Sequence, residues 1–369
     1  MRLAYHEKDP MNRPFYLLSI AALGAGLVAA FPAAAQVPDK PVRLVLQITV
    51  DQLRSDLIDR YSAGYGEGGF KRLQSDGAFY IDAHHRHANT ETVVGHTTLA
   101  TGTDPAIHGM VANNWLDRAT GLLNYNVQDP DFPLVGEGAG VDASTEIDPT
   151  QALATTEGRS PRPILTTTIS DEFRVAMGPR SRIFGVSVKD RGAITMAGHA
   201  GTAYWLSKAA ARMVTSTYYM EDYPDWVEDW NESGVVQSYA DTAWELSSDP
   251  AAYLFGASDD QQWETDFPGW GRTFPHAYGA ADGKYYTTLL TLSPAGDEIT
   301  LEFAKVLMAA EEIGQDEVPD YLSISFSSTD YVGHIFGASS LEAEDNLHRL
   351  DRTLASLFDY IDETVGLDQ

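Results

Sequence analysis

The sequence has 369 residues, of which 43% are hydrophobic, and this is enough apolar material for one large domain or two modest ones. Its formal net charge of -28 and its pI near 4.5 argue against electrostatically driven binding to nucleic acid or to an anionic membrane. The chain has no cysteine, which excludes disulfides and thiolate metal sites.

Residues 1–35 have the form of a secretory signal peptide. An apolar run from Phe15 to Phe31 follows Arg13, and the small residues up to Ala35 provide an A-x-A cleavage site. The run is short for a membrane span, so the sequence predicts cleavage after Ala35. We therefore expect a periplasmic or secreted protein with no stable membrane association after cleavage.

The first predicted core strand covers residues 42–50 and ends directly at Asp51. An almost continuous run of β-branched and other apolar residues is typical of a strand that is buried on both faces. Asp51 is therefore predicted to lie at the carboxyl end of a buried strand.

The segment Thr90–Asp117 combines a hydroxyl group with tight backbone. Thr92 is placed on a bend before a short helical run, where free N–H groups and the helix dipole stabilise an anion. Asn113 adds a side-chain donor later in the same segment. The segment is interpreted as a nucleophile and part of an oxyanion cradle.

Two further helix-strand units follow. Ser160 and Pro161 predict the start of a helix, and the strand 182–188 runs into Lys189 and Arg191. A second helix around 299–313 precedes a strand at 321–326 that leads to Asp330. Charged residues therefore follow both strands: Lys189 and Arg191 follow 182–188, and Asp330 follows 321–326. Alternating helices and strands predict an α/β fold with a parallel sheet and with ligands at the carboxyl edge of its strands.

Residues 206–284 interrupt this alternation. They contain five of the seven tryptophans and no long apolar period, so they are predicted to form an insertion or cap. Aromatic residues at this density suit a ligand ring or a sugar, but packing of a small irregular subdomain onto the sheet is favoured. The chain then ends with an amphipathic helix predicted over 341–363.

Several ionisable residues have both a structural and a functional interpretation. Asp330 and His334 are four residues apart, so on a helix they share one face and suit zinc. Lys189 and Arg191 are compatible with a solvated pair, with carboxylate binding, or with phosphoryl binding beside metals, and Asp190 favours the first slightly.

The other histidines are interpreted as structural. His84, His85 and His87 invite a metal assignment, but adjacent side chains of an extended chain point to opposite sides, which favours a solvated strand or loop. The remaining residues interpreted as structural hydrogen-bonding groups are His96, His108 and His199.

Taken together, these residues resemble the alkaline phosphatase superfamily, specifically the bacterial single-chain zinc alkaline phosphatases with a threonine nucleophile, which are related to nucleotide pyrophosphatases/phosphodiesterases. The resemblance is carried, in order, by VDQLRSD, TVVGHTTLATGTDPAIHG, VSVKDRGA and SISFSSTDYVGHIFG. It implies a three-layer α/β fold and hydrolysis of small-molecule phosphate monoesters through a phosphothreonine on Thr92.

The resemblance also implies a site with two zinc ions. Asp51 and Thr92 match the ligands of one ion, and Asp330 and His334 match ligands of the other. The residues that match phosphoryl-oxygen ligands are Asn113, Lys189 and Arg191. Family members of the diesterase branch lack the Lys and Arg pair, so the pair favours a monoesterase over a phosphodiesterase or nucleotide pyrophosphatase.

The sequence departs from the family after residue 369. Relatives continue into a strand with an adjacent Asp-His pair and later a further His, and these three ligands are absent here. We therefore expect a core that is incomplete at the C-terminus and has little activity. We also expect that the apolar face of the 341–363 helix and the sheet edge near 321–326 lack the segment that would cover them. A non-catalytic remnant that binds anions or a partner is the remaining alternative.

This interpretation predicts four segments. They are the signal peptide (1–35), the first part of the core (36–205), the insertion (206–284) and the second, truncated part of the core (285–369). The oligomeric state is not predicted by any feature of the sequence.

Overall fold

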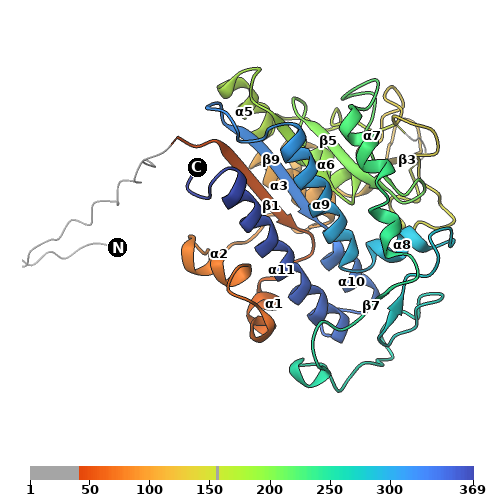
Figure 1. Ribbon diagram of the computed structural model, residues 1–369. Helices are drawn as coiled ribbons and strands as arrows, with labels where there is room; N and C mark the ends of the chain where they lie inside the picture. Colours follow the sequence, from red (N-terminus) through yellow and green to blue (C-terminus); the bar gives the residue numbers. More distant parts are fainter. Residues whose placement is uncertain (1–40, 155–157) are drawn as a thin grey trace, which may run out of the picture. The chain divides into compact units, whose positions relative to one another are not determined.

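The computed structural model describes residues 41–154 and 158–369, which belong to one compact unit (Figure 1). The predicted signal peptide, residues 1–35, lies outside the described residues. Within the described ranges, no helix combines the length and the hydropathy that crossing a membrane requires.

A five-stranded sheet forms the centre of the unit. Its strands, in spatial order, are β1 (Leu44–Val50), β9 (Asp320–Phe326), β4 (Ile183–Ser187), β5 (Thr202–Ser207) and β6 (Arg212–Val214). The first four run parallel, whereas β6 pairs antiparallel with β5. The predicted parallel α/β sheet is confirmed, with one antiparallel edge strand that the sequence did not indicate.

The position of β9 corrects one expectation. β9 pairs with β1 on one side and with β4 on the other, so residues 321–326 are in the interior of the sheet rather than at an uncovered edge. All seven residues of β9 are buried, as an apolar strand with neighbours on both sides should be. The sequence order of the strands does not reveal this insertion of the last strand between two earlier ones.

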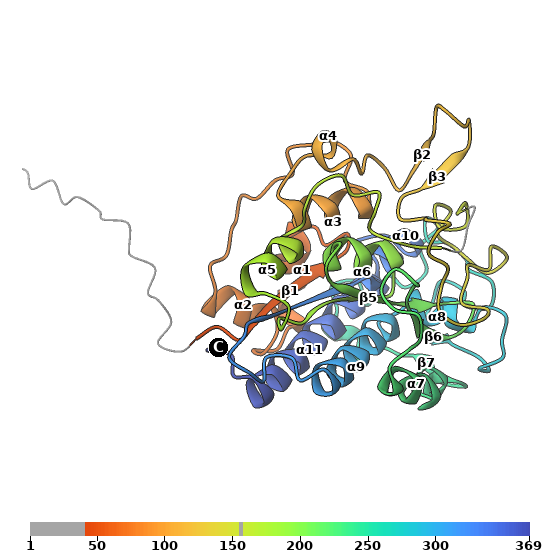
Figure 2. The same cartoon turned by 90° about the horizontal axis from the view of Figure 1, so that it is seen from above.

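Helices cover both faces of the sheet, which confirms the predicted three layers (Figure 2). Helices α3, α5 and α6 lie on one face, and α9 and α11 lie on the other. The helices are α1 (Ser55–Arg60), α2 (Phe70–Asp76), α3 (Thr92–Thr101), α4 (Pro105–His108), α5 (Ile169–Met177), α6 (Asp190–Ala197), α7 (Asp225–Glu232), α8 (Tyr286–Thr291), α9 (Ala295–Ala310), α10 (Ser328–Ile335) and α11 (Leu341–Thr364), with short 3-10 turns at Ser62–Gly64, Val236–Tyr239 and Pro250–Ala252.

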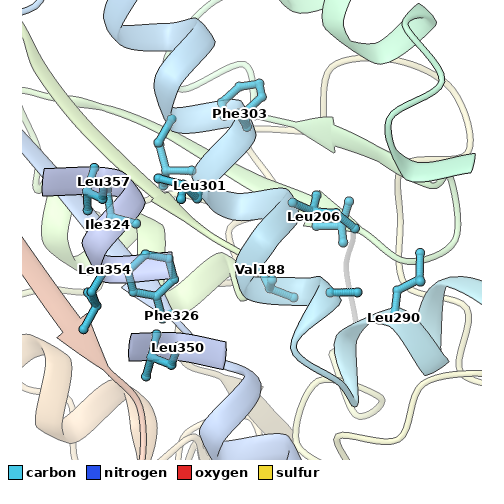
Figure 3. Close-up of a cluster of buried hydrophobic side chains, with 14 of the residues drawn as sticks. Val188, Leu206, Leu290, Leu301, Phe303, Ile324, Phe326, Leu350, Leu354 and Leu357 are labelled. Atoms are coloured by element: carbon cyan, nitrogen blue, oxygen red, sulfur yellow. The ribbon is translucent and has the colours of Figure 1, made fainter. Parts of the chain in front are cut away.

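The apolar face of α11 is part of the core. Leu350, Leu354 and Leu357 are at most 1% exposed, and Figure 3 shows them beside Ile324 and Phe326 of β9. The expectation that this helix would have an uncovered face is therefore wrong. The same periodicity that predicted the helix places its leucines on one side, and β9 and α9 cover that side.

Residues 206–284 contribute to the sheet and to the core. The segment starts in β5 and β6, continues through α7, and contains a separate antiparallel pair of two-residue strands, β7 (Ala243–Trp244) and β8 (His276–Ala277). The rings of Trp226 and Trp230 pack against Phe303 of α9. These contacts agree with aromatic residues that pack an irregular segment onto the core.

The start of α5 differs from the sequence prediction. The helix begins at Ile169, not at Pro161, because Thr168 and Asp171 form a capping box. The hydroxyl of Thr168 accepts from the backbone N–H of Asp171, and the carboxylate of Asp171 accepts from the N–H of Thr168. The T-x-x-D pattern was present in the sequence and is a stronger start signal than the Ser-Pro pair.

Candidate active site

Three charged side chains converge at the carboxyl edge of the sheet. Asp51 follows β1, Lys189 follows β4 at the N-cap of α6, and Asp330 lies in the first turn of α10 after β9. Because β9 separates β1 from β4, these strand ends are adjacent, and the three residues are at most 7% exposed. The structure thus brings all three residues to the carboxyl edge of the sheet, where parallel α/β sheets bind ligands.

Thr92 is the first residue of α3 and faces the same point. Its hydroxyl donates to Oδ2 of Asp51 at 3.2 Å. The N–H of Val93 donates to Oδ1 of Asn113 at 3.1 Å, and the N–H of Asn113 donates to the carboxylate of Glu91. Since Oδ1 of Asn113 is occupied, its amide nitrogen is the end of the side chain left to bind an anion.

Lys189 is buried between two carboxylates. Its ammonium group lies 2.7 Å from Oδ2 of Asp51, also donates to Asp330, and sits 4.6 Å from the ring centre of Tyr331. Burial lowers the pKa of Lys189, but the two carboxylates outweigh burial and raise that pKa above its ordinary value. Burial likewise raises the pKa of Asp330, while Lys189 outweighs it and holds that pKa well below its usual range.

Arg191 approaches Thr92 from the first turn of α6. Its Nη2 lies 2.6 Å from Oδ2 of Asp148 and 3.5 Å from the hydroxyl oxygen of Thr92, and its Nη1 lies 3.2 Å from the hydroxyl of Tyr125. Arg191 is 2% exposed and Lys189 is 1% exposed. The interpretation of Lys189 and Arg191 as a solvated pair is therefore wrong.

Asp330 and His334 share one face of α10, as their spacing predicted. Nε2 of His334 lies 3.3 Å from Oδ1 of Asp330, and this pairing raises the pKa of His334. Gln52 was missed by sequence reasoning. Its amide nitrogen donates to Oδ1 of Asp330 at 3.1 Å, from a backbone with φ of 61° that residues other than glycine rarely adopt.

The side chains at this edge provide atoms of the types that bind a divalent metal, but fewer of them than a metal site usually has. Asp51, Thr92, Asp330 and His334 offer carboxylate, hydroxyl and imidazole groups, which zinc accepts. Within 41–154 and 158–369, however, no group of three or more His, Asp or Glu side chains is arranged to hold a metal ion. Each predicted pair thus contributes two donors, fewer than the about three protein ligands of a catalytic zinc.

Five of the other histidines singled out from the sequence make hydrogen bonds within the fold, whereas His85 packs against the ring of His87 and lines the cleft that contains Thr92. His84 pairs with Asp82 at 2.7 Å in an exposed loop, and His87 contacts the carbonyl of Asn89 at 2.6 Å. The buried ring of His96 bridges the carbonyl of Thr92 and the hydroxyl of Ser325. His108 contacts the hydroxyl of Thr98, and His199 contacts the carboxylate of Asp171.

The charged and polar residues at the carboxyl edge of the sheet surround a cleft of about 1020 Å³. The predicted site residues that line it are Asp51, Thr92, Asn113, Arg191, Asp330 and His334. Lys189 does not line the cleft but contacts two residues that do. Asp148 and Gln52 also line it. Asp148 lies in an irregular segment without a motif, so no sequence signal pointed to it.

A family comparison matches nearly all of the described chain. The family described as type I phosphodiesterase / nucleotide pyrophosphatase matches residues 45–369. Over 327 residues the chain is 38% identical to alkaline phosphatase PhoV of Synechococcus elongatus, a match that covers 88% of this chain and 56% of the relative. A protein of Myroides odoratus named calcium-transporting ATPase is 36% identical, with 89% and 58% covered.

Solved structures agree with the sequence comparison. The crystal structure of wild-type alkaline phosphatase PafA has a TM-score of 0.81 at 35% identity, and the match covers 89% of this chain and 61% of that chain. A second PafA structure, of a variant substituted at a threonine, an asparagine, a lysine and an arginine, also has a TM-score of 0.81. The chain spans a little over half the length of the curated relatives that it matches.

Proposed function

Because this chain belongs to the type I phosphodiesterase / nucleotide pyrophosphatase family, within the alkaline phosphatase superfamily, we propose that its site hydrolyses small-molecule phosphate monoesters through Thr92. The observation that carries the proposal is the approach of Asp51 and Arg191 to one hydroxyl. Thr92 Oγ1 lies 3.2 Å from a carboxylate oxygen and 3.5 Å from a guanidinium nitrogen, at the N-terminus of α3. These surroundings support Thr92 Oγ1 as the group that forms a covalent intermediate.

In the first step, Thr92 Oγ1 attacks phosphorus, the Oγ1–P bond forms and the ester P–O bond breaks. The proton that Thr92 loses balances the proton that the leaving alkoxide gains. In the second step, water attacks phosphorus and the Oγ1–P bond breaks, so inorganic phosphate leaves and a proton from the water restores the hydroxyl of Thr92. The N-terminus of α3 favours the anionic oxygen in both steps.

Three side chains act on the phosphoryl oxygens in this proposal. Arg191 and the amide nitrogen of Asn113 reach them from the lining of the cleft, and Lys189 adds positive charge from behind Asp51 and Asp330. A monoester dianion carries a charge that a diester lacks, so two cations favour the monoester. The PafA variant supports this assignment, because its substituted threonine, asparagine, lysine and arginine occur in the same chain order as Thr92, Asn113, Lys189 and Arg191.

We also propose that two zinc ions act at this site, one held by Asp51 and Thr92 and the other by Asp330 and His334, with further donors from outside these two pairs. Bound zinc supplies charge that stabilises anionic oxygens and lowers the pKa of bound water to about 7. Zinc content measured after dialysis of wild-type and Asp330→Asn proteins tests this assignment. Equal metal content in both proteins would contradict it.

We also propose a periplasmic or secreted location after removal of residues 1–35. In this proposal, 206–284 is an insertion between the core segments 36–205 and 285–369 that also supplies β6 to the central sheet. The strongly acidic composition makes nucleic acid an unsuitable partner.

The test of the nucleophile compares Thr92→Ala with Thr90→Ala in the full chain loaded with zinc. Thr90 lines the same cleft two residues away, so its variant is a matched loss of one hydroxyl. Acid quenching during turnover of a phosphate monoester should trap phosphoenzyme in wild type and Thr90→Ala but not in Thr92→Ala. Phosphoenzyme in Thr92→Ala would disprove the assignment, and phosphate binding without phosphoenzyme or turnover in wild type would favour the non-catalytic alternative.

A further inference from the structure

Asp148 is a buried carboxylate that lines the cleft beside the proposed phosphoryl ligands. It is 9% exposed, and its Oδ2 accepts from Nη2 of Arg191 at 2.6 Å. Its other oxygen accepts from the N–H of Thr150 at 2.9 Å, and its own N–H donates to the carboxylate of Glu146 at 2.9 Å. Both ends of Asp148 are therefore held, so the carboxylate is a fixed partner for the guanidinium.

Arg191 is oriented by two contacts on opposite nitrogens. Asp148 holds Nη2, and the hydroxyl of Tyr125 holds Nη1 at 3.2 Å. Tyr125 is itself fixed, because its hydroxyl donates to Oδ1 of Asp190 at 2.6 Å. The same Nη2 that contacts Asp148 lies 3.5 Å from Thr92, and Nε of Arg191 has no hydrogen-bond partner among the described residues.

A planar guanidinium that is held at both terminal nitrogens has a defined direction for its remaining N–H groups. We propose that Asp148 is a positioning residue: it fixes Arg191 so that Nη2 faces Thr92 Oγ1, and it thereby sets the balance between phosphate affinity and turnover. This inference rests on the proposed function, because it assigns a role in the reaction of Thr92.

The balance follows from charge. The carboxylate of Asp148 occupies one donor of Arg191 and repels an incoming phosphoryl dianion, so it weakens phosphate binding. The same carboxylate holds the guanidinium in the direction that the reaction of Thr92 uses, so it raises the rate of the bound substrate. Removal of the charge should therefore change KM and kcat in the same direction, which general loss of structure does not do.

The experiment uses Asp148→Asn in the full zinc-loaded chain and in an Arg191→Ala background. Asp142→Asn is the matched control, because Asp142 is an exposed carboxylate in the same segment that caps the N–H of Ser144 and contacts neither Arg191 nor Thr92. The measurements are kcat and KM for a phosphate monoester and the Kd of inorganic phosphate, which needs no turnover.

We expect Asp148→Asn to lower kcat about tenfold or more and to tighten phosphate binding about threefold or more, the scale of one charge-assisted contact. In the Arg191→Ala background, Asp148→Asn should change kcat by no more than about twofold, because the guanidinium that Asp148 positions is already absent, and it should still tighten phosphate binding, because repulsion of the anion does not need Arg191. Asp142→Asn should resemble wild type in every measurement.

Two outcomes would overturn the positioning role. Equal effects of Asp148→Asn on kcat in both backgrounds would show that Asp148 acts independently of Arg191, and unchanged or weaker phosphate binding in Asp148→Asn would show that its charge does not oppose the anion. In a chain without measurable turnover, the phosphate titration alone decides. Failure of the proposed function is a separate result, because it appears as phosphoenzyme in Thr92→Ala regardless of what Asp148→Asn does.

Discussion

Replacement of Arg191 by Ala should impair monoester hydrolysis much more than diester hydrolysis. Arg191 is 2% exposed, and its Nη2 lies 3.5 Å from Thr92 Oγ1, so the lost contact is charge-assisted and desolvated. Such a contact contributes about 1.5–3 kcal/mol, and about 1.4 kcal/mol corresponds to a tenfold change. We therefore expect kcat/KM for the monoester to fall about ten- to hundredfold relative to the diester.

The substitution also leaves Asp148 buried without its cation, which costs stability, so the activity ratio must be separated from folding. Arg349→Met provides that control. Arg349 pairs at 2.9 Å with the fully buried carboxylate of Asp345, and it does not line the cleft. Arg349→Met should lower the free energy of unfolding and leave the ratio of monoester to diester hydrolysis unchanged. Equal losses on both substrates in Arg191→Ala would refute the assignment of Arg191 to the extra charge of the monoester.

Two further predictions concern stability. Leu354→Ala should lower the free energy of unfolding in urea by about 2–5 kcal/mol, because Leu354 is 1% exposed, whereas Leu367→Ala, at a 40% exposed position, should change it little; similar values would contradict the burial of α11. Burial raises the pKa of Glu342 from 4.5 to about 8, so its contribution to stability is fully present below pH about 4.5 and is lost as the pH rises toward 8. Glu342→Gln should therefore flatten the fall in unfolding free energy between pH 5 and pH 8, as measured by urea titration. The exposed control Glu363→Gln should leave the slope of that fall unchanged. An unchanged slope in Glu342→Gln would show that Glu342 is ionised in the fold.

The positions of the charged residues at the strand ends could be predicted from the sequence because they depend on local patterns. Asp51, Lys189 and Asp330 each follow a buried apolar run, and the end of such a run can be located within a residue or two. The order of the strands is not local. β9, last in the chain, pairs between β1 and β4, and this arrangement brings Asp330 to Lys189.

Residues in irregular segments could not be assigned from the sequence. Asp148 meets Arg191 only through the path of the loop, and Tyr125 meets it from the hairpin of β2 (Asn114–Leu116) and β3 (Leu123–Tyr125). Gln52 could not be predicted as a site residue for another reason. Its left-handed backbone is unusual for a glutamine, and only the folded strand end and α10 require it.

An acidic protein and an anionic substrate are compatible in this arrangement because their charges act over different distances. Exposed carboxylates such as Asp56, Glu67 and Glu363 contribute to the net charge of -28, and salt at physiological strength screens exposed charges beyond about 8 Å. Lys189 and Arg191 are buried beside the cleft, where screening is weak. Both cations are already paired with carboxylates. Lys189 pairs with Asp51 and Asp330, and Arg191 pairs with Asp148. A phosphoryl group must therefore compete with those carboxylates, which favours a doubly charged ligand over a singly charged one.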